Sequence, residues 1–229
     1  MPAAPTIVPI GGAGFSPAIL QFVLDLCERP RPRVCFVPTA SGDSSDYVVR
    51  FYEAFRDLDS VPSHVALHGT PEREAVRRQL LDQDAIYVGG GNTANMLAVW
   101  RLHGADVVLR EAWEQGIVLA GVSAGANCWF EASTTDSFGP LSGLRDGLGF
   151  LPGSFSPHYD AEPERRPTYQ RLVSEGFPAG FAADDGVALH FTWTELVETV
   201  AAGAGSAFRV EPGPGGTARE TALDLRRLG

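Results

Sequence analysis

Lysine is absent from this chain of 229 residues, so all 18 of its permanently basic side chains are arginine. A Schiff base with a carbonyl substrate, attachment of pyridoxal phosphate, a serine–lysine dyad and the phosphate-binding lysine of a P-loop all need an amine. These four kinds of site are therefore excluded, whatever fold the chain adopts.

Cysteine is also scarce. Only Cys27, Cys35 and Cys128 occur, an odd number that cannot pair completely, and two of them lie in apolar runs where a reduced thiol behaves as a small hydrophobe. Residues 1–5 lack the basic start and apolar core of a signal peptide, and no stretch approaches the roughly 18 apolar residues of a membrane span. We expect a soluble protein in a reducing, cytoplasmic setting.

Positive charge is in short supply. With 28 acidic residues against 18 arginines the formal net charge is −10, which disfavours nucleic acid and anionic membrane as partners. The 44% content of hydrophobic residues is enough for a sizeable core. Because no repeat or long linker is present, we expect one α/β domain over residues 1–229.

Apolar runs alternate with helical periodicity in the first half of the chain, which predicts an α/β fold with a mostly parallel sheet flanked by helices. The expected strands are residues 6–10, 33–37, 65–68, 85–88 and 117–120, and the expected helices are 17–26, 47–58, 71–81, 93–100 and 105–115. The second half predicts loops over 133–160, a helix over 168–175, and then a β-rich part with strands at 187–191, 196–201 and 207–211 before a turn at 212–216.

One hydroxyl stands out. Residues 121–125 read Gly-Val-Ser-Ala-Gly between an apolar run and a helix-compatible stretch at 124–129, which is the pattern of a nucleophile elbow. Glycines flank Ser123 because such a strained turn leaves little room for a Cβ on either side. Outside this context the same five letters are more often an ordinary turn. Here they predict that Ser123 is a nucleophile and that the N–H of Ala124 faces a developing oxyanion.

Two glycine clusters follow predicted strands. Gly89, Gly90 and Gly91 lie where α/β sheets bind ligands, and their N–H groups could complete an oxyanion hole. A phosphate cradle, weakened by the missing lysine, and a plain strand-to-helix turn are the alternatives. The cluster at residues 11–14 has Pro17 where a dinucleotide fingerprint needs its third glycine, so it is interpreted as a sharp turn beside the site.

Five histidines are available as the base. His64 and His68 are four residues apart in a predicted strand, roughly 13 Å from each other, which argues against a metal pair. His103 and His190 fit structural or solvated roles. His158, in a loop 35 residues after Ser123, is the predicted general base.

The acid that would orient His158 is less clearly marked. Four aspartates are within plausible reach: Asp136, Asp160, Asp184 and Asp185. The pair at 184–185 lies between apolar runs, so at least one of its carboxylates should be held near the core. A buried acid needs a partner, and His158 would be a suitable one.

These motifs, taken together and in this order, resemble the serine peptidases that include aspartyl dipeptidase (peptidase E) and cyanophycinase. The matching segments are residues 89–93, residues 121–127, the loop around His158 and residues 184–186. The resemblance implies a Ser-His-acid triad on an architecture related to class I glutamine amidotransferases, and a homodimer. The family acid is typically glutamate at the position of Asp185, so aspartate is a departure. Asp136 resembles another important acid and is the second choice.

The predicted reaction follows. His158 removes the Ser123 proton, the hydroxyl attacks a peptide carbonyl, and the N–H groups of Ala124 and of Gly91 or Gly90 hold the oxyanion until water hydrolyses the acyl enzyme. This mechanism requires no metal or organic cofactor. The order serine, histidine, acid differs from that of α/β-hydrolases.

The expected substrate is a short peptide, and its contacts are open. Arg165, Arg166 and Arg171 could bind a carboxylate or simply cover a solvated helix face. Glu131 could receive an N-terminal ammonium or be a surface acid, and Asn92 is a further candidate contact. The leading hypothesis is an aminopeptidase or dipeptidase. Cyanophycinase-like hydrolysis of β-aspartyl-arginine and a non-catalytic amidotransferase-like binding protein are the alternatives.

Overall fold

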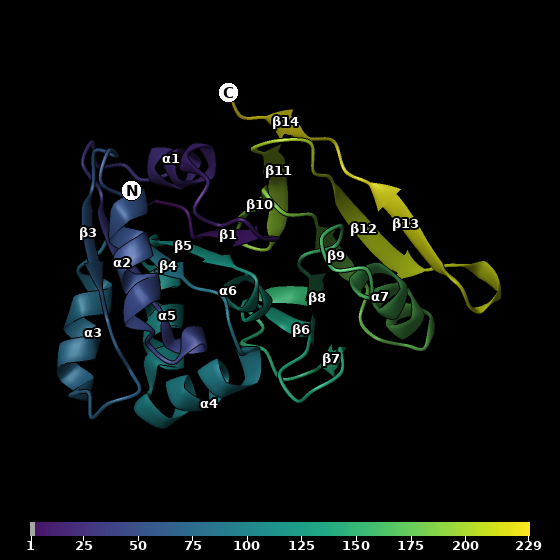
Figure 1. The fold of residues 1–229 in the computed structure, drawn as a ribbon, viewed down its shortest axis with the longest axis horizontal. Helices are drawn as coiled ribbons and strands as arrows, with labels where there is room; N and C mark the ends of the chain where they lie inside the picture. Colours follow the sequence, from purple (N-terminus) through teal and green to yellow (C-terminus); the bar gives the residue numbers. More distant parts are fainter. Residues whose placement is uncertain (1–2) are drawn as a thin grey trace.

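The structure, a computed structural model, describes residues 3–229, so the first two residues of the segment 1–5 discussed above lie outside it. Within that range eight strands form a central sheet: β1 Thr6–Ile10, β2 Arg33–Val37, β3 Val61–His64, β4 Ala85–Val88, β5 Val118–Val122, β10 Val187–Thr192, β11 Glu195–Ala201 and β14 Arg226–Arg227. Their order across the sheet is β14-β11-β10-β1-β5-β4-β2-β3 (Figure 1).

Five adjacent strands of this sheet are parallel: β1, β5, β4, β2 and β3. Ile7 of β1 is opposite Leu119 of β5, and Tyr87 of β4 is opposite Ala120 of the same strand. β10 then runs antiparallel to β1 and pairs with β11. The carboxyl ends of β1, β5 and β4 consequently meet at one edge of the sheet, where α/β proteins bind ligands.

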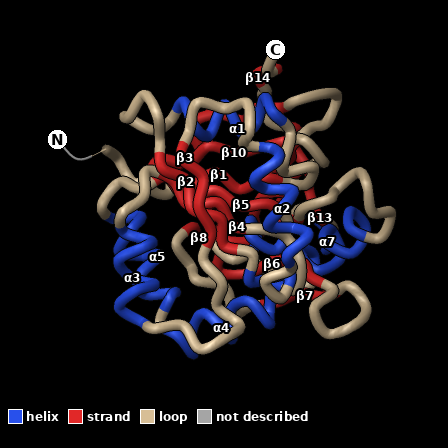
Figure 2. Tube along the Cα trace, turned by 60° about the vertical axis from the view of Figure 1, so that its left-hand side comes forward, coloured by secondary structure: helices blue, strands red, loops and turns tan. Residues whose placement is uncertain are grey.

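Helices cover both faces of the central sheet (Figure 2). On one face lie α1 Pro17–Asp25 and α2 Ser45–Ala54, and on the other α3 Arg73–Leu81, α4 Thr93–His103 and α5 Ala105–Glu114. Successive strand residues alternate between the two layers: Phe36 packs with α2 and Val37 with the opposite layer. Both faces are therefore buried, as expected of parallel strands that read as continuous apolar runs.

A second sheet lies beside the first and extends to the right in Figure 1. Within residues 3–229 its strands are β6 Phe130–Thr135, β7 Ser142–Leu144, β8 Leu151–Ser156, β9 Gly180–Ala183, β12 Ala207–Pro212 and β13 Ala218–Ala222. α7 Arg165–Ser174 packs against it through Tyr169 and Val173, both fully buried. The α/β class and the β-rich second half are thus confirmed.

Two predicted segments are wrong. The strand expected at 65–68 is absent, and the observed strand β3 ends before it, at His64. The N–H groups of Leu67 and His68 donate to the Asp43 carboxylate instead of to a neighbouring strand. The loops expected over 133–160 contain β7, β8 and the second half of β6. The serines and threonines of β6 and β8 are buried, and Thr134 bonds Ser156 at 2.8 Å, so buried strands here carry the composition of a loop.

The helix predictions differ from the structure mainly at their ends. α7 begins three residues before the predicted 168, because a proline, Pro167, is compatible with a first helical turn. The helix-compatible stretch at 124–129 forms only one turn, α6 Ala124–Asn127, and continues into β6. None of the helices in the described part of the chain has the length and apolar character needed to cross a bilayer.

Candidate active site

Ser123 lies at the carboxyl edge of the central sheet, between the end of β5 and the first residue of α6. Its φ of 55° and ψ of −113° are a conformation that residues with a side chain rarely adopt, which indicates backbone strain. The N–H of Ser123 donates to the carbonyl of Ile10 on β1 at 3.0 Å and holds the turn in place. Every other residue between 117 and 130 is buried, so Ser123 alone in this stretch is partly exposed.

Glycine is required on both sides of this turn. A Cβ on Gly121 would lie 2.1 Å from the carbonyl oxygen of Gly125, and a Cβ on Gly125 would lie 2.4 Å from that of Val88. These contacts are with backbone, which cannot move aside without shifting α6 or β4. The crowding expected from the glycine pattern around Ser123 is therefore present.

His158 lies just beyond a strand of the second sheet, and Asp185 lies where the chain passes from the second sheet to the central sheet. His158 follows β8, and Asp185 lies in the turn between β9 and β10. The Nδ1 atom of His158 is 2.7 Å from Oδ1 of Asp185. The imidazole is 21% exposed and the carboxylate 36%, so the pair is reachable from solvent. If Nδ1 carries the proton and donates a hydrogen bond to Asp185, the unprotonated Nε2 is the basic atom.

The glycine cluster at residues 11–14 packs directly against this pair, as the sharp turn expected beside the site. A Cβ on Gly12 would lie 1.8 Å from Oδ1 of Asp185 and 2.6 Å from Nδ1 of His158. The N–H of His158 donates to the carbonyl of Gly11 at 3.2 Å. The turn thus holds histidine and acid together by leaving them space and a backbone acceptor.

Ser123 and His158 line one cavity of about 560 Å³, a size suited to a small ligand. Its other lining residues come from the turn after β1, from α2 and from the ends of β4 and β5: Ala13, Gly14, Phe15, Ser16, Tyr47, Arg50, Gly90 and Val122. Within residues 3–229 no hydrogen bond joins Oγ of Ser123 to the imidazole. Such bonds commonly tighten only when substrate is bound.

The three predicted oxyanion donors differ in their distance from Ser123 and in the partners of their N–H groups. Ala124 is the first residue of α6, so its N–H has no carbonyl to bond within that helix. Gly90 lies next to the serine: a Cβ on it would be 3.8 Å from Oγ of Ser123, and its N–H donates to Oη of Tyr47 at 3.1 Å. Gly91 instead packs on the backbone of Ala40 with a φ of 140°. Gly90 is therefore better placed than Gly91.

The other three candidate aspartates do not bond to His158. Asp184 is buried, its carboxylate accepts the N–H of Ser206 at 2.8 Å, and burial raises its pKa. It is the acid that the sequence predicted near the core. Asp160 accepts the N–H of Asp185 at 2.9 Å and so fixes the turn that carries the carboxylate. Asp136 is exposed beyond β6 and does not line the cavity.

The predicted substrate contacts are not brought to this cavity. Asn92 caps α4 by accepting the N–H of Asn95, and Glu131 accepts the N–H of Gly153. The three arginines also have partners elsewhere: Arg165 is buried against Thr134 and Glu162, Arg166 pairs with Glu220, and Arg171 pairs with Glu175. Glu162 and Glu175 lie within four residues of their arginines, whereas Thr134 and Glu220 lie on strands of the second sheet, which local sequence could not place beside them.

The remaining histidines lie apart from Ser123. His64 bonds the hydroxyl of Tyr52, and His68 bonds the carbonyl of Thr39. His190 is buried in β10, where burial lowers its pKa. Among residues 3–229 no three His, Cys, Asp or Glu side chains are grouped so that they could hold a metal ion.

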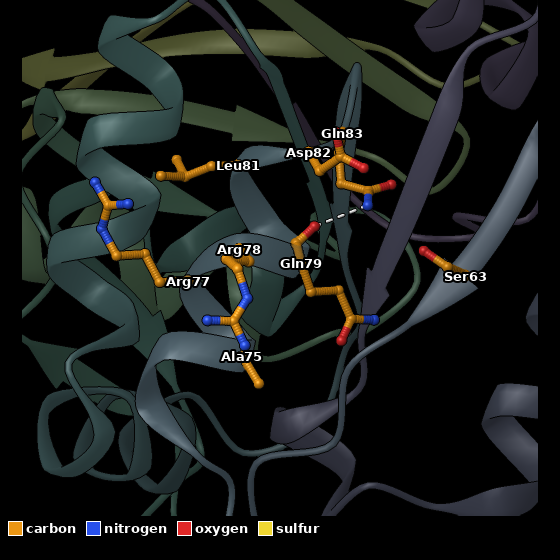
Figure 3. A pocket seen from close by; sticks show the side chains of 8 residues that line it. All are labelled: Ser63, Ala75, Arg77, Arg78, Gln79, Leu81, Asp82 and Gln83. Atoms are coloured by element: carbon orange, nitrogen blue, oxygen red, sulfur yellow. Dashed lines mark hydrogen bonds between the residues drawn. The ribbon is translucent and has the colours of Figure 1, made fainter.

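A larger cavity, of about 760 Å³, lies along α3 (Figure 3). Its charged side chains are already engaged, since Arg77 pairs with Glu111 and Arg78 with Glu72. A hydrogen bond from the Gln83 side chain to the carbonyl of Gln79 joins two of its lining residues (Figure 3). The lining contains no histidine beside its serine, Ser63, so this cavity lacks the groups for nucleophilic chemistry.

Sequence reasoning missed several cavity residues, among them Tyr47 and Arg50. Both lie in the first two turns of α2, the helix that follows β2. A usable signal existed: a helix that follows a parallel strand begins at the carboxyl edge of the sheet, so its first turns can face the site. Tyr47 is also four residues before the buried Phe51, which places the two on one side of the helix.

Known proteins that are similar to this chain include several peptidases. The sequence profile described as Peptidase family S51 matches residues 10–198. The uncharacterized peptidase YgaJ of Bacillus subtilis (strain 168) is 52% identical over 211 residues, covering 89% of this chain and 91% of that protein. A peptidase E of Shewanella amazonensis (strain ATCC BAA-1098 / SB2B) is 32% identical over 154 residues, covering 66% of this chain and 63% of that protein.

A similar fold occurs in the crystal structure of a peptidase from an acI-B1 Actinobacterium. The TM-score is 0.68 at 16% sequence identity, and the match covers 97% of this chain and 95% of the other. At this identity the likeness concerns the arrangement of helices and strands.

Proposed function

Because the chain belongs to peptidase family S51, it is a serine-type peptidase, and we propose that it is an exopeptidase, an aminopeptidase or dipeptidase that hydrolyses short peptides through Ser123, His158 and Asp185. The observation that carries this proposal is the 2.7 Å contact between His158 and Asp185 at the cavity that also contains Ser123. A strained, partly exposed serine that shares a cavity with a histidine–carboxylate pair has the components of acyl transfer.

In the proposed first step Nε2 of His158 takes the proton of Ser123 as the hydroxyl attacks the peptide carbonyl. Asp185 accepts the hydrogen bond from Nδ1, fixes the tautomer and stabilises the imidazolium that forms. The imidazolium then protonates the leaving amine. Water, activated by the same nitrogen, hydrolyses the acyl group from Ser123 and restores the enzyme.

Backbone N–H groups would hold the oxyanion that forms on the carbonyl oxygen. The N–H of Ala124 supplies one donor. The second is the N–H of Gly90, which in the folded chain donates to Tyr47; the oxyanion would replace that hydroxyl as its acceptor. Two preorganised donors of this kind commonly contribute most of the stabilisation in acyl transfer.

The shorter acid is compatible with this mechanism. The side chain of Asp185 is one methylene shorter than that of glutamate. Its contact with His158 nevertheless has a normal hydrogen-bond length. The missing Cβ of Gly12 and the bond from Asp185 to Asp160 support this close approach. Asp185 is thus favoured over the exposed Asp136.

The test is hydrolysis of Asp-Leu, Ala-Leu, Leu-p-nitroanilide and β-Asp-Arg by the wild type and by Ser123→Ala. We expect cleavage of at least one α-peptide substrate, and a fall in kcat of at least about 10³-fold in the variant. Ser142→Ala, which removes an exposed hydroxyl from β7, is the matched control and should keep full activity. Circular dichroism melts show whether each variant is folded.

Two results would contradict the proposal. Full activity in a folded Ser123→Ala would remove Ser123 from the mechanism. Cleavage of β-Asp-Arg alone would replace the exopeptidase with a cyanophycinase-like hydrolase that uses the same triad.

A further inference from the structure

Arg165 is the one arginine that is buried in the described chain, with 4% of its surface exposed. A buried cation is costly unless it is paired and its N–H groups are bonded. Nε of Arg165 donates to Oε2 of Glu162 at 2.6 Å, and Nη1 donates to the carbonyl of Thr134 at 3.0 Å. Because the Glu162 side chain is about half exposed, the guanidinium joins a surface loop to the buried strand β6.

The Thr134 end of this contact leads to the nucleophile. The carbonyl of Thr134 accepts a second hydrogen bond, from Nδ2 of Asn127 at 3.0 Å. Asn127 is the last residue of α6 and is buried, and its own N–H donates to the carbonyl of Ser123 at 2.9 Å. Arg165 and the turn that carries Ser123 are therefore bonded to the same backbone oxygen through one side chain each.

The Glu162 end leads to the base. The N–H of Glu162 donates to the carbonyl of His158 at 3.1 Å, and the N–H of Arg165 donates to the carbonyl of Glu162 at 2.9 Å. These bonds fold residues 158–165 into consecutive turns that begin at His158. His158 has a φ of 52°, a conformation that is strained in a residue with a side chain and persists only where the surrounding structure holds it.

Ser123 and His158 are thus connected by a route that does not pass through the cavity. It runs from the elbow through Thr134 to Arg165, and on through Glu162 to the loop of the histidine. Because one of the two catalytic residues ends a strand of the central sheet and the other follows a strand of the second, no single element fixes their separation. A guanidinium suits this task, since its donors point in fixed directions from one plane.

We propose that Arg165 is a positioning residue, which fixes the alignment of His158 with Ser123 through its two hydrogen-bond partners. This role rests on the proposed peptidase function. Arg165 is not among the residues that line the cavity, so it affects the rate through the histidine and not through the binding of substrate. A displacement of about 1 Å at a catalytic group can lower a rate about 100-fold.

Two variants interrupt the route. Arg165→Met keeps the apolar stem and removes both bonds, and Glu162→Ala removes one bond at the half-exposed end, where truncation should leave the fold intact. Arg219→Met is the matched control, because Arg219 lies on β13 of the same sheet, is exposed and pairs with one carboxylate, that of Glu211, at 2.9 Å. Chemical denaturation establishes that each variant is folded.

The first readout separates kcat from KM. On the peptide that the wild type cleaves best, we expect kcat to fall about 10- to 100-fold in Arg165→Met and by a smaller factor in Glu162→Ala, with KM changed less than about threefold. Arg219→Met should match the wild type. Full kcat in a folded Arg165→Met, or a raised KM with kcat unchanged, overturns the inference.

The second readout is the rate at which a fluorophosphonate probe labels Ser123. In Arg165→Met labelling should slow by a factor similar to that in kcat and still reach one adduct per chain, because the serine is intact but poorly aligned with its base. A merely structural role would lower the number of labelled molecules and leave the rate of each unchanged. That result would contradict a positioning role.

Hydrogen–deuterium exchange separates this inference from the catalytic proposal, because it needs no turnover. In Arg165→Met the amides of residues 158–165 should exchange at least about tenfold faster, and those of β1 and β5 should keep their wild-type rates. If the wild type neither cleaves a peptide nor reacts with the probe, but this exchange depends on Arg165, the proposed function fails and the hold of Arg165 on the histidine loop stands. Unchanged exchange in residues 158–165 overturns the inference even in an active enzyme.

Discussion

Gly12 is the residue whose size most directly determines the geometry of the proposed triad. It contacts both members of the His158–Asp185 pair, and any side chain at this position would occupy the space of the Asp185 carboxylate. Its role is steric, and it differs in this from glycines that are needed for a positive φ.

We predict that Gly12→Ala lowers kcat/KM by at least about 100-fold, because the new methyl group separates the histidine from its acid. The measurement is the rate on whichever substrate the wild type cleaves best. Gly69→Ala is the control, since a Cβ there meets nothing within 4 Å, and it should retain wild-type activity. A fully active Gly12→Ala would mean that the His158–Asp185 contact is unimportant for the reaction.

At this scale the sequence was informative where chemistry depends on short local patterns. Ser123 is marked by its flanking glycines, and Asp185 by a polar turn between apolar runs. Tyr47 and Arg50 carry no such local mark, since their importance depends on how α2 packs on the sheet. Arg165 shows the converse: it follows His158 closely in sequence, but its guanidinium is buried against Thr134.

Among the elements, α2 connects the core to the cavity. Phe51 is fully buried and stacks on Phe36 of β2 with ring centroids 4.6 Å apart. Tyr47 and Arg50 precede it by one turn or less. The position of the cavity wall therefore depends on an aromatic contact beneath it.

We expect Phe51→Ala to reduce the free energy of unfolding by about 3–5 kcal/mol, the usual cost of truncating a buried phenylalanine. In the variant that still folds, KM should rise more than kcat falls, because the wall that carries Arg50 loses its support while Ser123 and His158 keep theirs. Chemical denaturation and steady-state kinetics measure the two effects. Phe138→Ala, at a side chain that is 74% exposed, should change neither. Unchanged stability in Phe51→Ala would contradict this account of α2.

Elements were predictable where one physical signal dominated. The strands of the parallel sheet are apolar runs, and four of the five predicted in the first half lie at or within two residues of their predicted positions. β8 was missed because Ser154 and Ser156, which are buried, satisfy their hydroxyls within the fold. A buried strand that contains polar side chains can be predicted only when the hydrogen-bond partners of those side chains are known.

Across the whole molecule, the proposed site exists only when the two sheets are packed together. Ser123 belongs to the central sheet, His158 follows a strand of the second, and Asp185 lies where the chain passes from one to the other. The bridge between Gly12 and Asp185 joins the two parts at this point. No local stretch of sequence contains the site, which is why its members were predicted individually and their distances were not.

The most direct test of the central claim is covalent labelling with a fluorophosphonate probe, followed by peptide mapping in a mass spectrometer. The probe reacts with a serine hydroxyl only when a base activates it. The account predicts one modified residue, Ser123, with labelling abolished in Ser123→Ala and strongly slowed in a folded His158→Gln. Absence of an adduct at Ser123, or equal labelling in His158→Gln, would contradict a nucleophile activated by His158.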